Sequence, residues 1–239
     1  MGNTCSTVCS TTGREDHEED LNYENLCCIV ESKLGLSKIQ IKDLESVLEE
    51  ISYKKRAIDF QTLADVFLKF DVPKKEFLAE DNLFTVLYSG LIGTLEEDKG
   101  YILSTSLPFC KGELFDKKSV LWRCLETVQK NFISYEELVD LIKMLIIIPT
   151  KVIPEMASKG NVGVMDRNLK LLINATEEEI NDYAKQYLPE VPRNVKFIHR
   201  HEFDTWLASD RASRLFVSSH HRKALLTYLN LKKGIEVPG

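Results

Sequence analysis

The first residues of the chain carry the groups whose chemistry is easiest to specify. The sequence begins Met1-Gly2-Asn3-Thr4-Cys5-Ser6, which fits the M-G-x-x-x-[ST] acceptor for N-myristoylation on Gly2 after Met1 is removed. One myristoyl chain binds a membrane only marginally, so a stable anchor needs a second signal. Cys5 and Cys9 offer thiols for S-palmitoylation beside that first lipid. The sequence therefore predicts a chain anchored by myristate and palmitate at the cytoplasmic face of a membrane. The alternative is an unmodified polar tail that happens to carry two cysteines.

Histidine and serine side chains near the C-terminus could form a metal site or a nucleophilic centre. His199 and His201 form one pair and His220-His221 another, but no cysteine or cluster of carboxylates stands at ligand spacing. Ser218-Ser219 precedes the second pair without a G-x-S-x-G elbow. We therefore expect solvent-facing histidines, no metal ion, no cofactor and no catalytic residue, and we interpret the protein as not being an enzyme.

The composition indicates a folded protein that does not bind nucleic acid. The chain has 239 residues, of which 44% are hydrophobic, and a formal net charge of −6, whereas phosphate binding requires a basic domain or stripe. Residues 193 to 239 hold nine Lys/Arg against four Asp/Glu. That local excess predicts either a solvated face or a contact with anionic lipid or an acidic partner.

The cysteines and the apolar runs limit the compartment and the relation to the bilayer. The six cysteines show no zinc spacing and the chain opens without a secretory signal, so we expect free thiols in a reducing compartment. Cys27-Cys28 is interpreted either as part of the core or as a pair of extra acylation sites. The longest apolar run, Met144–Ile148, is far shorter than the roughly 20 residues that a membrane span requires.

Beyond residue 20, apolar residues recur with helical spacing. The first group predicts two amphipathic helices separated by a short break. Its members are Leu36, Ile39, Leu44, Val47, Leu48, Ile51, Leu63, Val66, Phe67 and Phe70. Ser37 is the expected N-cap of the first helix, and Asp71-Val72-Pro73 ends the second.

The same helix-break-helix unit returns in the second half of the chain, at residues 120–148 and 177–228. Thr176 followed by Glu179 fits a capping box. Strand signals are confined to Tyr101–Leu103 and Lys196–Ile198, so the predicted fold is nearly all helical.

Each break carries an isoleucine, followed by polar or aromatic residues and a helix. The clearest copy is Asn131-Phe132-Ile133-Ser134-Tyr135-Glu136-Glu137, and the others surround Ile58, Ile102 and Ile198. This arrangement resembles the EF-hand superfamily, in particular its myristoylated neuronal calcium sensor and calcineurin B-like members. A looser likeness exists to the helical half of myristoylated TLDc proteins, whose loops are also degraded.

The resemblance implies an all-α fold of paired EF-hand-like helix-loop-helix units in two lobes behind a flexible lipidated tail. The tether would comprise residues 1–20, the N-terminal lobe residues 21–110 and the C-terminal lobe residues 111–239. In the third unit, Trp122-Arg123 stands in place of the aromatic and basic pair of an entering helix. Ile133 stands at loop position eight and Glu137 at position twelve.

The loops implied by this resemblance lack the oxygens that calcium needs, which are supplied from positions 1, 3, 5, 7 and 12. The third loop places Glu126, Val128, Lys130, Asn131 and Glu137 at positions 1, 3, 5, 6 and 12. The fourth places Val191, Arg193, Val195, Lys196 and Glu202 at the same positions. Asn131, at position 6, can adopt the backbone conformation of the loop's turn but supplies no negative charge. The positive charges of Lys130, Arg193 and Lys196 would repel a divalent cation. We expect no calcium in these loops. The alternative is a site in another register, with Glu96, Glu97 and Asp98.

These observations predict a calcium-independent, membrane-tethered adaptor. Its partners would be membrane lipid and an amphipathic helix of another protein. Trp122 and Trp206 would line the groove for that helix, or else serve as ordinary core aromatics. Two alternatives stay open, a calcium sensor with atypical loops and a structural subunit of a larger membrane or cytoskeletal assembly.

Overall fold

The chain is mostly helical in the computed structural model, which describes residues 23–52, 58–72, 83–88, 95–125, 132–159, 166–188 and 196–234. The α-helices are α1 (Tyr23–Lys33), α2 (Ile41–Ser52), α3 (Phe60–Leu68), α5 (Leu83–Leu87), α6 (Leu95–Ser106), α7 (Leu114–Leu125), α8 (Tyr135–Ile147), α9 (Ile153–Lys159), α10 (Arg167–Ile173), α11 (Glu177–Ala184), α12 (Arg200–Leu207), α13 (Asp210–Ser213) and α14 (Ser218–Lys232). The other elements are the 3₁₀ turns η1 (Leu36–Lys38), η3 (Lys185–Tyr187) and η4 (Arg214–Phe216), the π-helix η2 (Ile148–Val152), and the strands β1 (Phe132–Ser134) and β2 (Phe197–His199). The predicted all-helical class is confirmed.

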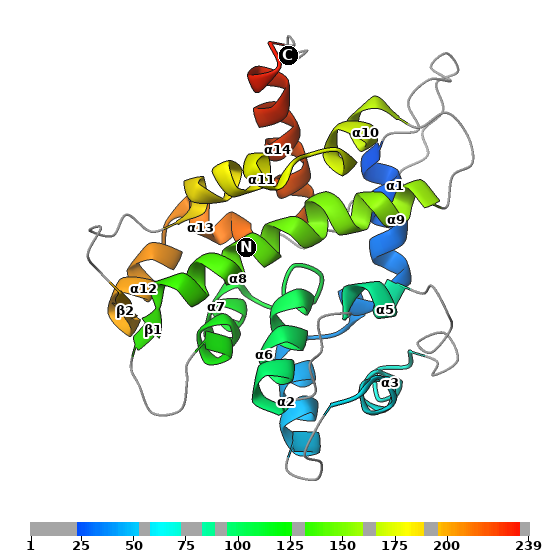
Figure 1. Ribbon diagram of the computed structural model, residues 1–239. Helices are drawn as coiled ribbons and strands as arrows, with labels where there is room; N and C mark the ends of the chain where they lie inside the picture. Colours follow the sequence, from blue (N-terminus) through cyan, green and yellow to red (C-terminus); the bar gives the residue numbers. More distant parts are fainter. Residues whose placement is uncertain are drawn as a thin grey trace.

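One helical run made of α8, η2 and α9 crosses the middle of the molecule (Figure 1). The helix continues through Pro149 as far as Lys159. Pro149 has no N–H to donate, and the geometry changes from α to π over the segment that contains it. The hydroxyl of Thr150, which is fully buried, donates to the carbonyl of Ile146 at 2.6 Å.

The two amphipathic helices expected in the first part of the chain are present as α2 and α3. Asp59 caps α3, because its Oδ1 accepts a hydrogen bond from the backbone N–H of Thr62 at 2.7 Å. The expected cap at Ser37 is wrong. Gly35 has a φ of 67° and turns the chain into η1, so Ser37 lies inside that 3₁₀ turn and α2 begins only at Ile41.

The strand expected at Tyr101–Leu103 is also wrong, because these residues lie within α6. The break expected around Ile102 is therefore absent from the described chain. Hydroxyl groups of the last turn bond to the helix's own carbonyls, with Thr105 Oγ1 donating to Tyr101 at 2.9 Å and Ser106 Oγ to Ile102 at 2.7 Å. The Ser106 hydroxyl also bonds the hydroxyl of the buried Tyr88 at 2.8 Å. Tertiary packing and these bonds outweigh the local β-propensity.

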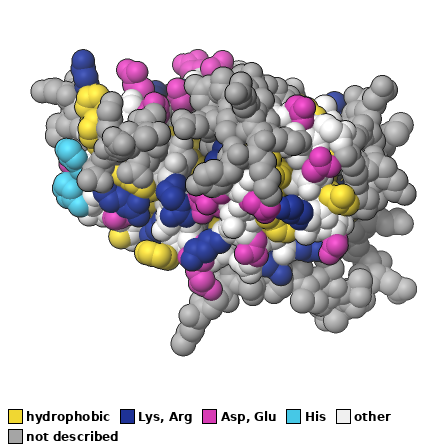
Figure 2. Space-filling view, turned by 90° about the horizontal axis from the view of Figure 1, so that it is seen from below, with side chains coloured by type: hydrophobic (Ala, Val, Ile, Leu, Met, Phe, Trp, Pro, Cys, Tyr) yellow, Lys and Arg dark blue, Asp and Glu magenta, His cyan; other side chains and the backbone are white. Residues whose placement is uncertain are grey.

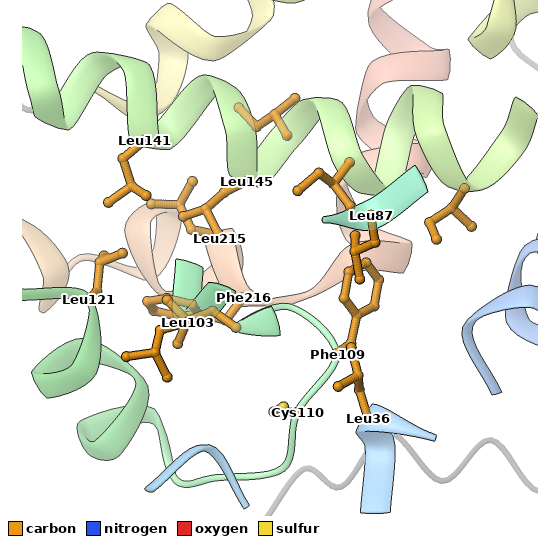
Figure 3. Close-up of a cluster of buried hydrophobic side chains, with 14 of the residues drawn as sticks. Leu36, Leu87, Leu103, Phe109, Cys110, Leu121, Leu141, Leu145, Leu215 and Phe216 are labelled. Carbon is orange, nitrogen blue, oxygen red and sulfur yellow. The ribbon is translucent and has the colours of Figure 1, made fainter. Parts of the chain in front are cut away.

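The buried apolar side chains form one contiguous cluster drawn from both predicted lobes. Figure 3 shows part of it, where Leu103 and Leu121 lie beneath α8 together with side chains of η4. Contacts cross the predicted boundary at residues 110 and 111, with α2 against α7 and α1 against α9. Arg123 of α7 strengthens the first contact, because its Nε and Nη2 donate to the two carboxylate oxygens of Glu45 at 2.6 and 2.7 Å.

A buried arginine joins the first described helix to the last. The side chain of Arg222 on α14 has no exposed surface. Its Nε and Nη2 donate to the carboxylate of Glu24 at 2.8 and 2.5 Å, and its Nη1 donates to Glu31 at 2.5 Å. Burial alone would lower the pKa of Arg222, but the two carboxylates of α1 outweigh it and raise the pKa above its ordinary value. Arg222 therefore stays charged, and it holds α1 against the core.

Replacing Arg222 with methionine is expected to lower the free energy of unfolding by roughly 3–5 kcal/mol, because it leaves two partly buried carboxylates without their counter-charge. Urea unfolding monitored by circular dichroism measures this loss. Lys185→Met is the control, since the Lys185–Asp182 pair is an i,i+3 surface pair and its loss should change little. Equal effects of the two substitutions would show that the buried pair contributes no more than a surface pair.

Candidate functional site

Two helix-strand-helix units meet at the β1–β2 ladder. In one unit α7 leads to β1 and α8, and in the other α11 and η3 lead to β2 and α12. The strands are antiparallel and pair Ile133 with Ile198 at their centre. Both isoleucines are buried, at 1% and 2% exposure, whereas the flanking Phe132 and Phe197 pack edge to face on the other side, with ring centroids 4.8 Å apart.

Glu137 and Glu202, the two predicted loop carboxylates that the structure describes, occupy equivalent places. Each lies in the first turn of the helix that follows its strand and reaches back to the residue before the helix. Glu137 accepts from the backbone N–H of Ser134 at 3.3 Å, and Glu202 accepts from that of His199 at 2.8 Å. Their charge suits a helix N-terminus, where the backbone N–H groups have no partner within the helix. The same device appears at Thr176, where the predicted capping box is confirmed.

Several predicted loop residues cannot be placed. Glu126 and Asn131 lie outside the described residues, and so do the side chains of Glu96, Glu97 and Asp98. Within the described part of the chain, no group of three or more His, Cys, Asp or Glu side chains is arranged to hold a metal ion.

The two tryptophans pack against one side chain of α12. Trp122 lies edge-on to Phe203 with ring centroids 5.0 Å apart, and Trp206 lies edge-on to the same ring at 5.6 Å. Trp122 is buried, at 3% exposure, and the guanidinium of Arg200 lies 4.9 Å from its ring centroid. Trp206 is half-buried, and its indole N–H donates to the carbonyl of Tyr187 at 3.0 Å. The structure thus places the ring of Trp122 between α7 and α12, and the ring of Trp206 against Phe203 and η3. A groove lined by the two rings stays a prediction.

An open hollow lies nearby, between α8 and α11. Its volume is about 520 Å³, and Val139, Ala184 and Leu188 supply its apolar lining. Polar and charged side chains of α8, α11 and η3 complete the lining, and these are Lys143, Glu177, Glu178, Asn181, Asp182 and Lys185. A second hollow of about 270 Å³ borders α5, α6, α8 and η2, and it shares Lys143 with the first. These hollows offer apolar surface with a charged rim, the lining that an amphipathic ligand requires.

A chain of hydrogen bonds beneath α14 links two histidines through two tyrosines. His221 Nε2 lies 3.1 Å from the carbonyl of Leu215 and must donate to it. In a neutral imidazole Nδ1 is then an acceptor, and it receives the Tyr183 hydroxyl at 3.3 Å. Tyr183 in turn accepts from the Tyr187 hydroxyl at 2.7 Å, and Tyr187 accepts from His220 Nε2 at 3.0 Å. All four bonds therefore run in one direction.

The chain corrects the expectation that these histidines face solvent. His221 is fully buried, and burial lowers its pKa to about 4, with the neighbouring charges of His220 and Arg222 acting in the same direction. Burial also lowers the pKa of His220 and raises that of Tyr183. His199 and His201, by contrast, lie in the strand β2 and the exposed first turn of α12.

Because the folded pKa of His221 lies below its ordinary value of 6.5, the unfolded chain binds a proton that the folded chain excludes. The stabilisation is complete above pH 6.5 and is lost as the pH falls toward 4, at about 1.4 kcal/mol per pH unit. We expect His221→Gln to reduce this slope by one proton, as measured by urea unfolding at pH 4.5 to 7.5. His201→Gln is the control, since His201 is exposed. An unchanged slope in His221→Gln would contradict the assignment.

The predicted acylation sites Gly2, Cys5 and Cys9 lie outside the described residues. Cys27 and Cys28 on α1 differ from one another. Cys27 has no exposed surface and burial raises its pKa to about 12, whereas Cys28 is exposed. Cys27 is therefore a core residue. Among the described residues, no helix is long and apolar enough to cross a bilayer.

Comparison of the chain with protein-family models, with curated proteins and with solved structures found no match.

Proposed function

We propose that the protein is a membrane-tethered, calcium-independent, EF-hand-like adaptor that binds an amphipathic helix of a partner protein. The pairing of Ile133 with Ile198 carries this proposal. These are the residues that the sequence resemblance assigns to position eight of the third and fourth loops. Their antiparallel pairing supports an arrangement in which α7 with α8 and α11 with α12 form two related units.

The caps at Glu137 and Glu202 support the calcium-independent form of the proposal. Both carboxylates have a backbone N–H to accept from and stabilise the start of α8 or α12 without a cation. The same two loops carry Lys130 and Arg193 at positions where a calcium loop has oxygen ligands. A fixed positive charge about 4 Å from a divalent ion opposes binding by several kcal/mol. Regulation would then depend on lipid turnover or on the supply of the partner.

The hollow between α8 and α11 supports a helical partner. Its apolar lining from Val139, Ala184 and Leu188 would accept one or two large apolar side chains of a ligand. The acidic side chains of Glu177 and Glu178 border that surface and would favour basic residues on the ligand's polar face, whereas Asp182 is already paired with Lys185. In this arrangement Trp122 holds α7 against α12, and Trp206 holds α12 against η3.

A calcium titration of the purified, acylated chain by calorimetry, with magnesium present, is expected to give no saturable heat. Far-ultraviolet circular dichroism should stay unchanged in the same titration. A saturable signal near about 1 µM, in the range of calcium sensors, would contradict the proposal. If Glu137→Gln and Glu202→Gln removed that signal, the calcium would be assigned to the two paired loops and the protein would be an atypical sensor.

The lipid anchor is tested by expressing the chain with an N-myristoyltransferase and measuring intact mass and membrane fractionation. Gly2→Ala is expected to lose the myristoyl mass and to move from the membrane fraction to the soluble one, because the second acyl group requires the first to bring the thiols to the bilayer. Cys5→Ser with Cys9→Ser should keep the myristoyl mass and weaken retention. Cys28→Ser tests separately whether the exposed Cys28 is a further acylation site, and Ser10→Ala is the matched control. Unchanged fractionation of Gly2→Ala together with co-purification of one fixed complex would instead favour a structural subunit.

A further inference from the structure

The first turn of α7 exposes two large apolar side chains side by side. Leu114 is 39% exposed and Phe115 is 73% exposed, the largest value among the exposed large hydrophobic residues of the described chain. Neither residue lines the two hollows beside α8. Figure 2 shows a face on which hydrophobic side chains stand in small groups among lysine, arginine and acidic side chains. Most of the Phe115 ring stays in contact with water in the folded chain. Such exposed apolar surface can be buried by binding a ligand.

Lysines of two segments distant in sequence lie in and beside this turn. The backbone of Lys111 joins the segment before α2, with its N–H donating to Ile39 at 2.8 Å and its carbonyl accepting from Ile41 at 2.9 Å. Lys42 then reaches Asp116 at 2.6 Å. The resulting Phe115 patch is defined by Leu114 and Phe115 with Lys38, Lys42, Lys111, Lys117 and Lys118.

The Phe115 patch is basic in an acidic protein. Its five lysines stand against Asp43, Glu113 and Asp116 in the same two segments, an excess of two positive charges on a chain whose net charge is −6. Asp204 of α12 faces Lys118, but it is itself paired with Arg200 at 2.9 Å and adds no net charge. An exposed phenylalanine beside a net positive charge suits a lipid surface, whose anionic headgroups cover an apolar interior.

We propose that the Phe115 patch is a membrane contact, in which Phe115 and Leu114 enter the headgroup region of an anionic bilayer while the surrounding lysines meet lipid phosphates and carboxylates. The proposal deepens the proposed function, since it assigns an orientation to a tethered protein. A ring that protrudes beside a net positive charge fits a deformable anionic lipid surface better than a folded partner, which would need a complementary pocket. The 22 residues that precede α1 can span up to about 75 Å, so the lipid anchor and the patch can reach one bilayer.

Vesicle sedimentation with the Gly2→Ala chain tests the patch without any acyl group. The chain is mixed with phosphatidylcholine vesicles that contain either 30% phosphatidylserine or none, at about 100 mM and about 500 mM salt. We expect binding to the phosphatidylserine vesicles alone, weakened at high salt. Adding Phe115→Ala should reduce the partition coefficient roughly tenfold, because the ring no longer leaves water, and Phe115→Trp should restore it. Leu231→Ala is the matched control, since Leu231 is 68% exposed on α14, far along the chain.

Each outcome bears on the patch separately from the anchor. Loss with Phe115→Ala, retention with Leu231→Ala and rescue with Phe115→Trp support the proposal even if the wild-type chain proves to carry no lipid. Equal binding by Phe115→Ala and its parent, or no binding of the Gly2→Ala chain to anionic vesicles, overturns it and leaves the lipid anchor untouched. Binding that is equal on vesicles without phosphatidylserine overturns it as well, because the lysines would then have no role.

Discussion

The buried contact of Arg222 with Glu24 and Glu31 is the interaction on which the arrangement of the helices depends. Helix α1 has 11 residues, a length at which an isolated helix is marginal in water. Its two carboxylates are largely removed from solvent and would repel one another without the guanidinium between them. Removing three charges from water is costly, so the arrangement is tolerated only in a geometry where Nε, Nη1 and Nη2 each donate to a carboxylate. The contact of Arg222 with Glu24 and Glu31 therefore determines the position of α1, and its net contribution to stability is small.

The two helices joined by the Arg222 contact both pack against the long helical run from α8 to α9. The π-helix at its centre brings the carbonyl of Pro149 to within 3.5 Å of Arg222 Nη1. Helix α1 packs along α9, and α14 packs against η2. The same run carries Glu137 at its start and borders both hollows on its flanks. The candidate partner surface and the attachment of the N-terminal helix thus share one rigid element.

The spacing of apolar residues and the capping residues was enough to predict those parts of the fold that depend on near neighbours in the sequence. The helical class, α2 and α3, the cap at Thr176 and the strand around Ile198 all follow from residue spacing and capping chemistry. The rest depended on distant partners. Nothing near Arg222 indicates that its carboxylates lie on a helix 191 and 198 residues earlier, so a tail rich in arginine and lysine suggested a solvated face. His221 was misjudged for the same reason, since Tyr183 stands 38 residues away. The error at Tyr101–Leu103 came from weighing β-propensity without the tertiary contacts of α6.

The sequence separation of the arginine contact also bears on how the chain is made. A ribosome adding 5–20 residues per second needs about 10–40 s to move from Glu24 to Arg222, which stands 198 residues later. During that interval α1 has no arginine to neutralise its carboxylates. Its acidic side chains stay hydrated until α14 has been made. Docking of α1 through this contact is therefore expected to be among the last steps of folding.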